Sequence, residues 1–161
     1  SAHTNLDCVS NGVNDALVKR LGITDEDVLD NNNGLGRIGY VQECSLQAFA
    51  EHVKKQLRAD YVVIGDAGRA VHKVAVCGGA GSNLIEEALR QQADTLLTGD
   101  VKYHDAQRAV FSGLNIIDAG HQCTEWPILE NWADRLSLRF TEKDWNITLK
   151  VAKEELLLKH V

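Results

Sequence analysis

Short apolar runs alternate with amphipathic segments through the second half of the chain. Runs at residues 71–77, 95–97 and 114–117 are typical of buried strands, and each precedes a loop that contains glycine. After each loop comes a segment whose apolar residues recur at helical spacing, and these segments are residues 84–89, 101–110 and 125–138. This alternation predicts an α/β fold with helices on both faces of a sheet.

The first half of the chain is less regular. Residues 12–21 and 46–57 have apolar positions at helical spacing, with Gly22 as the stop of the first helix and Ser45 as the N-cap of the second. We also predict strands at residues 37–43 and 61–64, a loop at 30–34, a final edge strand at 144–151, and a helical or frayed segment at 152–161. The expected architecture is a mixed, mostly parallel sheet flanked by helices.

Composition and charge narrow the class of protein. The chain has 161 residues, 44% of them apolar, which is enough for one domain with a substantial core. A net charge of −6 makes a nucleic-acid partner unexpected, and no apolar run approaches the ~20 residues of a membrane span. The four cysteines (Cys8, Cys44, Cys77 and Cys123) form no Cys-x-x-Cys pair, so we expect reduced thiols in a cytoplasmic protein.

The start of the chain is unusual. There is no methionine, and Ser1-Ala2 leads straight into the polar motif His3-Thr4-Asn5-Leu6-Asp7. A native N-terminus normally begins with methionine and rarely runs directly into residues with chemical function. We therefore expect the sequence to be a fragment of a longer chain.

Glycines and polar residues follow each of the last three predicted strands. In open α/β sheets, ligands bind beyond the carboxyl ends of the strands, so these loops are expected at one edge of the sheet. The three sets are Gly78, Gly79, Gly81 and Ser82; Thr98, Gly99, Asp100 and His104; and Asp118, Gly120, His121 and Glu125. Tight strand-to-helix turns also need glycine and aspartate, so a structural interpretation of each loop stays open.

The first of these loops is a candidate cofactor-binding site. The backbone amides of Gly78, Gly79, Gly81 and Ser82 would face a phosphate or another anion if they opened a helix after a strand. The loop lacks the Lys-Ser/Thr of a Walker A motif and matches Gly-x-Gly-x-x-Gly poorly. A purely structural turn is the alternative.

Asp7, His121 and Glu125 are the candidate metal ligands. One imidazole and two carboxylates suit a borderline divalent ion such as zinc, manganese, iron or cobalt. We expect the three to converge at the carboxyl edge of the sheet, where Asp7 would bridge two ions and Glu125 would complete one coordination sphere. His121 would need an acceptor for its other ring nitrogen, and Asp118 is the candidate.

His104 lies four residues after Asp100, in the first turn of a predicted helix. Its chemistry suits a proton carrier or a group that supports a metal ligand, and an exposed capping residue is the alternative. Glu125 and His104 are the candidate catalytic residues.

Six motifs resemble the Nif-three-like family, whose members are also called GTP cyclohydrolase type-two homologues. They are residues 1–7 (SAHTNLD), 12–17 (GVNDAL), 34–39 (GLGRIG), 74–82 (VAVCGGAGS), 98–104 (TGDVKYH) and 118–121 (DAGH). The resemblance implies two similar α/β lobes, a ring-shaped homohexamer and a dinuclear metal centre in a cleft facing the ring interior. It places Asp7, His121 and Glu125 on family metal ligands, and His3, Asp100 and His104 near the site.

The chain departs from this family in three respects. The family's other two ligands are a His-His pair upstream of the His-Thr-Asn-Leu-Asp motif, and no such pair occurs here. We therefore expect one Nif-three-like domain over residues 1–161, incomplete at its N-terminus. Residues 139–161 match the family little, and Gln92 stands where the family usually has glycine.

Two functions are consistent with these observations. The first is a metal-dependent hydrolase that acts on a small molecule, such as a purine nucleotide like GTP, through a metal-bound hydroxide. The second is a metal-binding or regulatory oligomer without turnover of its own. A complete ligand set with a positioned general base would separate the two.

Overall fold

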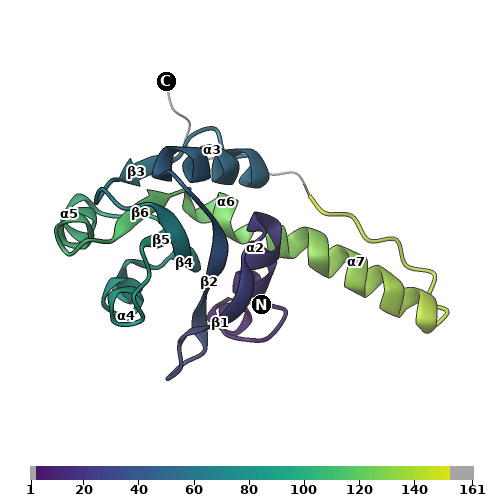
Figure 1. The fold of residues 1–161 in the computed structure, drawn as a ribbon. Coiled ribbons are helices and arrows are strands. Elements are labelled where there is room, and N and C mark those ends of the chain that lie inside the picture. The colour runs from purple at the N-terminus through teal and green to yellow at the C-terminus, as the bar shows by residue number, and fades with distance from the viewer. Residues whose placement is uncertain (1–2, 153–161) are drawn as a thin grey trace.

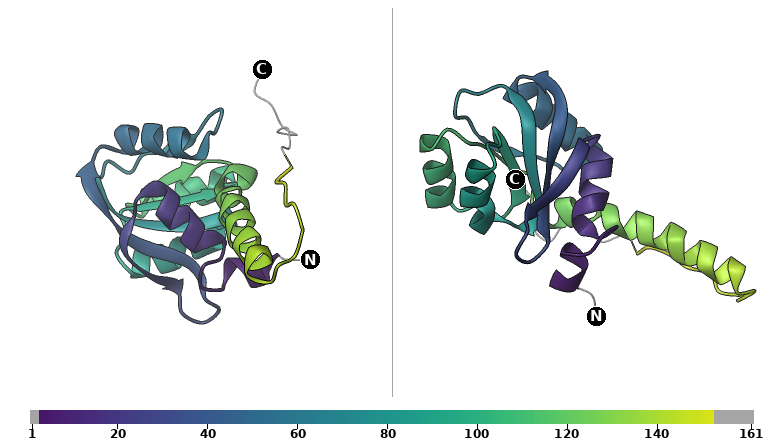
Figure 2. Two further views of the ribbon diagram at one scale, coloured as in Figure 1. Left: turned by 90° about the vertical axis from the view of Figure 1, so that its right-hand side faces the viewer. Right: turned by 60° about the horizontal axis from the view of Figure 1, so that its bottom comes forward.

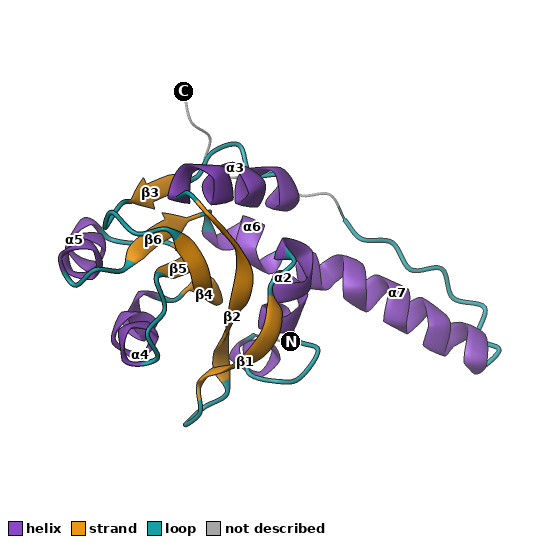
Figure 3. Ribbon diagram, in the orientation of Figure 1, coloured by secondary structure: helices purple, strands orange, loops and turns teal. Residues whose placement is uncertain are grey.

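The computed structural model describes residues 3–152, which form a six-stranded open sheet with helices on both faces (Figures 1 and 3). Its strand order is β1-β2-β4-β5-β6-β3. The strands are β1 (Thr24–Asp30), β2 (Leu35–Cys44), β3 (Val63–Gly65), β4 (Val71–Ala80), β5 (Thr95–Gly99) and β6 (Asn115–Asp118). The α-helices are α1 (Thr4–Asp7), α2 (Val13–Leu21), α3 (Leu46–Leu57), α4 (Ile85–Arg90), α5 (Tyr103–Phe111), α6 (His121–Glu125) and α7 (Pro127–Glu142), and a 3-10 turn, η1, spans Ser82–Leu84.

The sheet is mixed, which confirms the expected α/β class. Strands β4, β5 and β6 are parallel, as their connecting helices require. Parallel pairing is confined to these three central strands, because β2 joins β4, β1 joins β2, and β3 joins β6 in antiparallel fashion. The expectation of a mostly parallel sheet therefore holds for its centre and not for its edges.

Alternating side chains of the central strands supply two hydrophobic cores, one on each face of the sheet. Val74, Val76, Leu97 and Ile117 face α2 and α3, whereas the neighbouring Ala75, Cys77, Leu96 and Ile116 face α4 and α5. A strand covered on both faces has no polar side, which explains the continuous apolar runs of its sequence.

Local sequence signals set the ends of the first long helices. The hydroxyl of Ser45 accepts a hydrogen bond from the Ala48 amide, so α3 begins where the N-cap predicts. Gly22 adopts a left-handed conformation (φ 69°) that ends α2. Both predicted helices are confirmed.

Strand β1 was not predicted from the sequence. Its residues are mostly acidic, and only Leu29 is fully buried, so no alternating pattern is present. The strand forms because the turn at residues 31–34 folds it onto β2, at the edge of the sheet.

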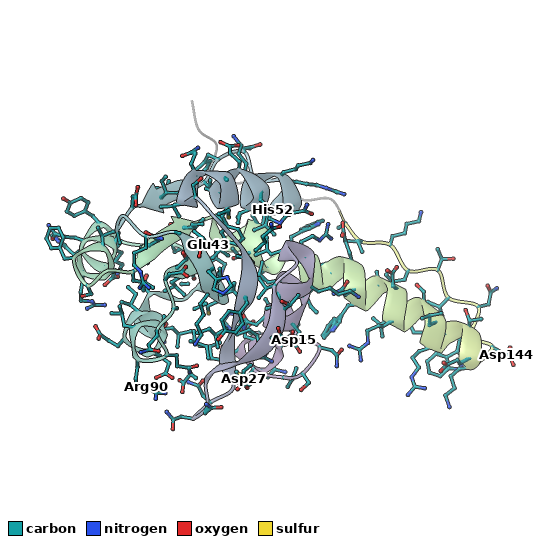
Figure 4. The ribbon with its side chains drawn as sticks, in the orientation of Figure 1. Asp15, Asp27, Glu43, His52, Arg90 and Asp144 are labelled. Atoms are coloured by element: carbon teal, nitrogen blue, oxygen red, sulfur yellow. The ribbon has the colours of Figure 1, made fainter. Side chains whose placement is uncertain are left out.

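The C-terminal region differs from the expectation. Helix α7 projects away from the sheet, with Asp144 just beyond its far end (Figures 1, 2 and 4). The predicted edge strand at 144–151 is wrong, since residues 145–152 carry no secondary structure and the chain returns beside α7 instead of joining the sheet. Of the segment predicted as helical or frayed, residues 153–161 lie outside the described part. Among residues 3–152, no helix is long and apolar enough to cross a membrane.

Candidate metal site

His121 and Glu125 lie on the same side of helix α6, which begins three residues after β6. Their spacing of four residues brings His121 Nε2 to 3.2 Å from Glu125 Oε1. The other ring nitrogen, Nδ1, lies 2.7 Å from Asp100 Oδ2, in the loop that follows β5. The imidazole is thus held between two carboxylates at the carboxyl edge of the parallel strands.

The orienting partner of His121 is Asp100 and not Asp118, which corrects the sequence prediction. The carboxylate of Asp118 accepts hydrogen bonds from the amides of Val101 and Gly120 and so joins the two loops. Asp100 reaches the imidazole because β5 and β6 pair with Thr98 beside Asp118. Asp100 follows Thr98 by two residues and His121 follows Asp118 by three, so the two side chains lie next to each other.

Asp7 reaches the same region from the other end of the chain. It ends the single-turn helix α1 and lines one cleft together with His3, His121 and Glu125. The cleft has a volume of about 760 Å³ and continues along α7, where Trp126, Leu129, Trp132, Leu136, Leu149 and Val151 form an apolar wall. The three candidate ligands therefore line one cleft, and their role as metal ligands stays a prediction.

The charges around the cleft influence one another. Burial raises the pKa of Asp7, an effect that the nearby His3 and His121 partly offset. Burial by itself would lower the pKa of His121, but the hydrogen bond to Asp100 and the charge of Glu125 outweigh it and raise the pKa. The site thus favours the protonated, positively charged form of the imidazole between its two carboxylates.

The glycines at the end of β4 have a structural role. Strand β4 continues to Ala80, so Gly78 and Gly79 lie within it. Their amides donate to Asn14 Oδ1 and Thr124 Oγ1, both at 2.9 Å. These two amides are not available to a phosphate, and the structural interpretation applies to them.

The absence of side chains on these glycines makes room for the site. A Cβ on Gly79 would lie 2.7 Å from Glu125 Oε1 and 3.1 Å from His121 Nε2. A Cβ on Gly81 would lie 2.6 Å from Thr98 Oγ1, and the buried hydroxyl of the next residue, Ser82, has no hydrogen-bond partner in the described region. Glycine at position 79 therefore lets the β4 backbone pass directly beneath the candidate ligands.

Two buried polar residues at the site were missed from the sequence. Asn14 donates to the Asp7 carbonyl and accepts from the Gly78 amide, and Thr124 bonds both the Gly79 amide and the carbonyl of His121. Both are fully buried. Its place in the motif at residues 12–17, as a polar residue on an apolar helix face, was the signal that could have identified Asn14.

His104 does not reach the cleft. It lies exposed in the first turn of α5, with its ring against that of Tyr103 at 5.5 Å between centroids. Its exposure agrees with the alternative interpretation, but the N-cap of α5 is Lys102 and no side chain of the described residues caps the helix. Of the residues that the family resemblance adds, His3 lines the cleft and Asp100 holds His121.

The three candidate ligands share a cleft without enclosing an ion. Within residues 3–152, no group of three His, Cys, Asp or Glu side chains is arranged closely enough to hold a metal by itself. Any tightly bound ion would therefore need ligands in addition to those that this part of the chain brings together.

These features define an α/β protein with a histidine–carboxylate cleft at the carboxyl edge of its parallel strands. The chain belongs to the family described as Duf34/NIF3 (NGG1p interacting factor 3), which matches residues 1–155. The resemblance noted in the sequence is thereby confirmed. The expectation that residues 139–161 match the family poorly stays a prediction.

Curated relatives carry the name "GTP cyclohydrolase 1 type 2 homolog". The protein of Streptococcus pneumoniae is 35% identical over 156 residues, covering 92% of this chain and 58% of the relative. The protein of Lactococcus lactis is 37% identical over 125 residues, covering 75% of this chain and 49% of the relative. The chain thus spans roughly half the length of these relatives.

Solved structures share the fold. A Bacillus cereus protein related to NIF3 superposes with a TM-score of 0.92 at 24% identity, covering 99% of this chain and 72% of that one. Reduced HcgD from Methanocaldococcus jannaschii superposes with a TM-score of 0.74 at 33% identity, covering 86% and 56%.

Proposed function

We propose that this chain contributes part of a dinuclear divalent-metal centre to a hydrolase, with Asp7, His121 and Glu125 as ligands. The carrying observation is the contact of His121 with Asp100, which fixes Nδ1 and leaves Nε2 directed toward Glu125 in the shared cleft. An acceptor on the second nitrogen is the arrangement that metal-ligating histidines usually have.

The donor set suits zinc, manganese, iron or cobalt, because it combines imidazole nitrogen with carboxylate oxygen. Three ligands are too few for two ions, so the proposal requires further ligands from outside the described residues. The relatives offer room for them, since this chain spans only 49% and 58% of two of their lengths.

A bound divalent ion would supply hydroxide by lowering the pKa of its water to about 7. The protein residues would bind and orient: Asp100 holds the imidazole at Nδ1, and Glu125, 3.2 Å from Nε2, would accept a proton. The names of the relatives support a purine nucleotide such as GTP as the substrate. His104 has no part in this proposal, because it does not line the cleft.

The ring-shaped homohexamer implied by the resemblance belongs to the same proposal. Leu136, Leu138 and Ile147 are large apolar side chains exposed on and beside α7, and an assembly would cover such residues. Light scattering on the purified protein gives its mass and hence the number of subunits.

A metal-binding or regulatory protein without turnover is the second candidate. It is favoured by the open arrangement of the ligands, since residues 3–152 form no closed metal cage and Glu125 would serve as both ligand and base. The two candidates predict the same metal binding and differ only in turnover.

Metal titration and turnover test these proposals together. By calorimetry, this chain is expected to bind zinc or manganese weakly, because each ion would lack several ligands. A longer form that carries the upstream region of the relatives should bind sharply more tightly, and Asp7→Ala should abolish that gain.

Sub-micromolar binding by this chain alone would contradict the shared-site proposal. GTP hydrolysis that needs added metal supports the hydrolase, and tight binding without turnover supports the second candidate.

A further inference from the structure

Asn14 connects three elements that meet at the candidate site. It lies in the first turn of α2 and is 0% exposed. Its Nδ2 donates to the Asp7 carbonyl at 2.8 Å, and its Oδ1 accepts from the Gly78 amide at 2.9 Å. One amide side chain thus joins α1, α2 and β4, and both of its ends are paired.

Asp7 depends on such a connection for its position. Helix α1 is a single turn with no buried residue, and a helix of this length has no stability of its own in water. Within α1, the partly buried side chain of Leu6 packs against the small cluster of Val13, Ala16 and Ile128. The hydrogen bond from Asn14 is directional, so it restricts where Asp7 lies more closely than this contact does.

The same short stretch of β4 also fixes the other two candidate ligands. Gly78 bonds Asn14, which holds the Asp7 backbone, and Gly79 bonds Thr124, which lies between His121 and Glu125 on α6. The two glycine amides therefore anchor both sides of the cleft to β4. Asn14 connects Gly78 to Asp7, and Thr124 connects Gly79 to the helix that carries His121 and Glu125.

We propose that Asn14 is a positioning residue of the metal centre, which it serves by fixing Asp7 against β4 opposite His121 and Glu125. This inference rests on the proposed metal function. Without Asn14 the fold would persist, but Asp7 would lose its fixed place relative to His121 and Glu125 across the cleft, and metal–ligand bonds of ~2.0–2.2 Å leave little slack for such movement.

Asn115 provides a matched control. It is also fully buried, its Nδ2 donates to the Arg69 carbonyl and its Oδ1 accepts from the Ala67 amide, both at 2.9 Å. It starts β6, at the end of the strand away from His121. Asn115→Ala removes the same type of side chain and similar hydrogen bonds without touching the cleft.

The experiment compares Asn14→Ala with Asn115→Ala in this chain by manganese titration, thermal unfolding and backbone hydrogen exchange. Paramagnetic broadening by Mn²⁺ measures weak binding. Asn14→Ala should weaken it by about tenfold or more, the usual effect of losing a group that orients a ligand. Asn115→Ala should stay within about twofold of the unaltered chain, because it is remote from the site. Exchange of amides in residues 4–8 should speed up in Asn14→Ala only.

The outcomes separate this inference from the function on which it rests. Equal losses of Mn²⁺ binding in the two variants, at equal losses of stability, would overturn the positioning role. If Mn²⁺ broadens no signal of the unaltered chain, the proposed ligand set fails instead, and hydrogen exchange of residues 4–8 alone decides whether Asn14 holds Asp7. Should Asn14→Ala fail to fold, Asn14→Ser takes its place, since its hydroxyl is too short to bridge both partners.

Discussion

The two ends of the parallel strands carry similar polar residues but use them in opposite ways. At the amino end, Asp94 accepts hydrogen bonds from the amides of His72 and Lys73 and from the Thr95 hydroxyl, and Asn115 bonds Arg69 and Ala67. Asp94 is only 5% exposed. This network satisfies itself within the protein, so it stabilises the fold and offers nothing to a ligand.

At the carboxyl end, the polar groups are held but not enclosed. The side chains of Asp100, His121 and Glu125 are 59%, 45% and 36% exposed, and those of His121 and Glu125 line the cleft. The difference shows that residue type alone does not separate polar residues with a structural role from polar residues of the candidate site. What distinguishes them is whether the polar atoms find all of their partners inside the protein.

The comparison is tested most strongly at the amino end by Asp94→Ala. The change leaves two backbone amides and a hydroxyl without their acceptor in a buried place, so we expect a loss of about 3 kcal/mol in the free energy of unfolding. Denaturant unfolding measures it. Asp27→Ala, at an exposed position on β1 (labelled in Figure 4), is the control and should stay within about 0.5 kcal/mol. A loss below about 1 kcal/mol for Asp94→Ala would mean that the network is not structural.

Gly79→Ala tests whether the carboxyl end tolerates a methyl group in the space between β4 and Glu125. The added Cβ would lie 2.7 Å from Glu125 Oε1, and the backbone has φ +69°, which disfavours any side chain. We expect destabilisation by about 2 kcal/mol together with weaker metal binding, because Glu125 must move. Gly68→Ala, at φ +75° with open space around it, reproduces the backbone strain without the contact. Equal metal binding in the two variants would show that Glu125 is not a ligand.

Asp100→Ala should separate function from stability. Its contact with His121 is between exposed side chains, so the free energy of unfolding should fall by less than about 1 kcal/mol. Metal binding should weaken by roughly 10–100-fold, because the imidazole loses the acceptor that orients it. Calorimetry and denaturant unfolding give the two values. A variant that lost stability without losing metal affinity would place Asp100 with the structural residues of the amino end.

The sequence was sufficient to predict the parts of the molecule that depend on local pattern. Strands β4 to β6 followed from their apolar runs, and α3 followed from its stripe and from Ser45. Strand β1 did not, because an acidic edge strand forms through its partner and not through its own periodicity. The segment 144–151 has suitable residues for a strand but finds no neighbouring strand to pair with.

The same distinction holds for the candidate site. The three candidate ligand positions could be proposed from motifs, but the residues that hold them in place could not. Asp100 meets His121 only through the register of β5 with β6, and Asn14 meets Gly78 across 64 residues of sequence. Hydrogen bonds between distant segments leave no periodic trace, so the groups that hold a site are harder to predict than the groups that form it.

The smallest expected effect concerns Gln92, the residue that the family resemblance singled out as a departure from glycine. Gln92 adopts φ 61°, the left-handed region that costs most residues about 1 kcal/mol, and its side chain is exposed. Gln92→Gly should therefore raise the free energy of unfolding by about 0.5–1 kcal/mol, after the greater flexibility of glycine in the unfolded state is subtracted. Chemical denaturation measures this gain, and Gln91→Gly, at φ −85°, should instead destabilise. Position 92 follows α4 and precedes β5, at the amino end of the strand, so metal binding should not change. A change in metal affinity on Gln92→Gly would mean that the two ends of the sheet are coupled, and the division of labour between them would then fail.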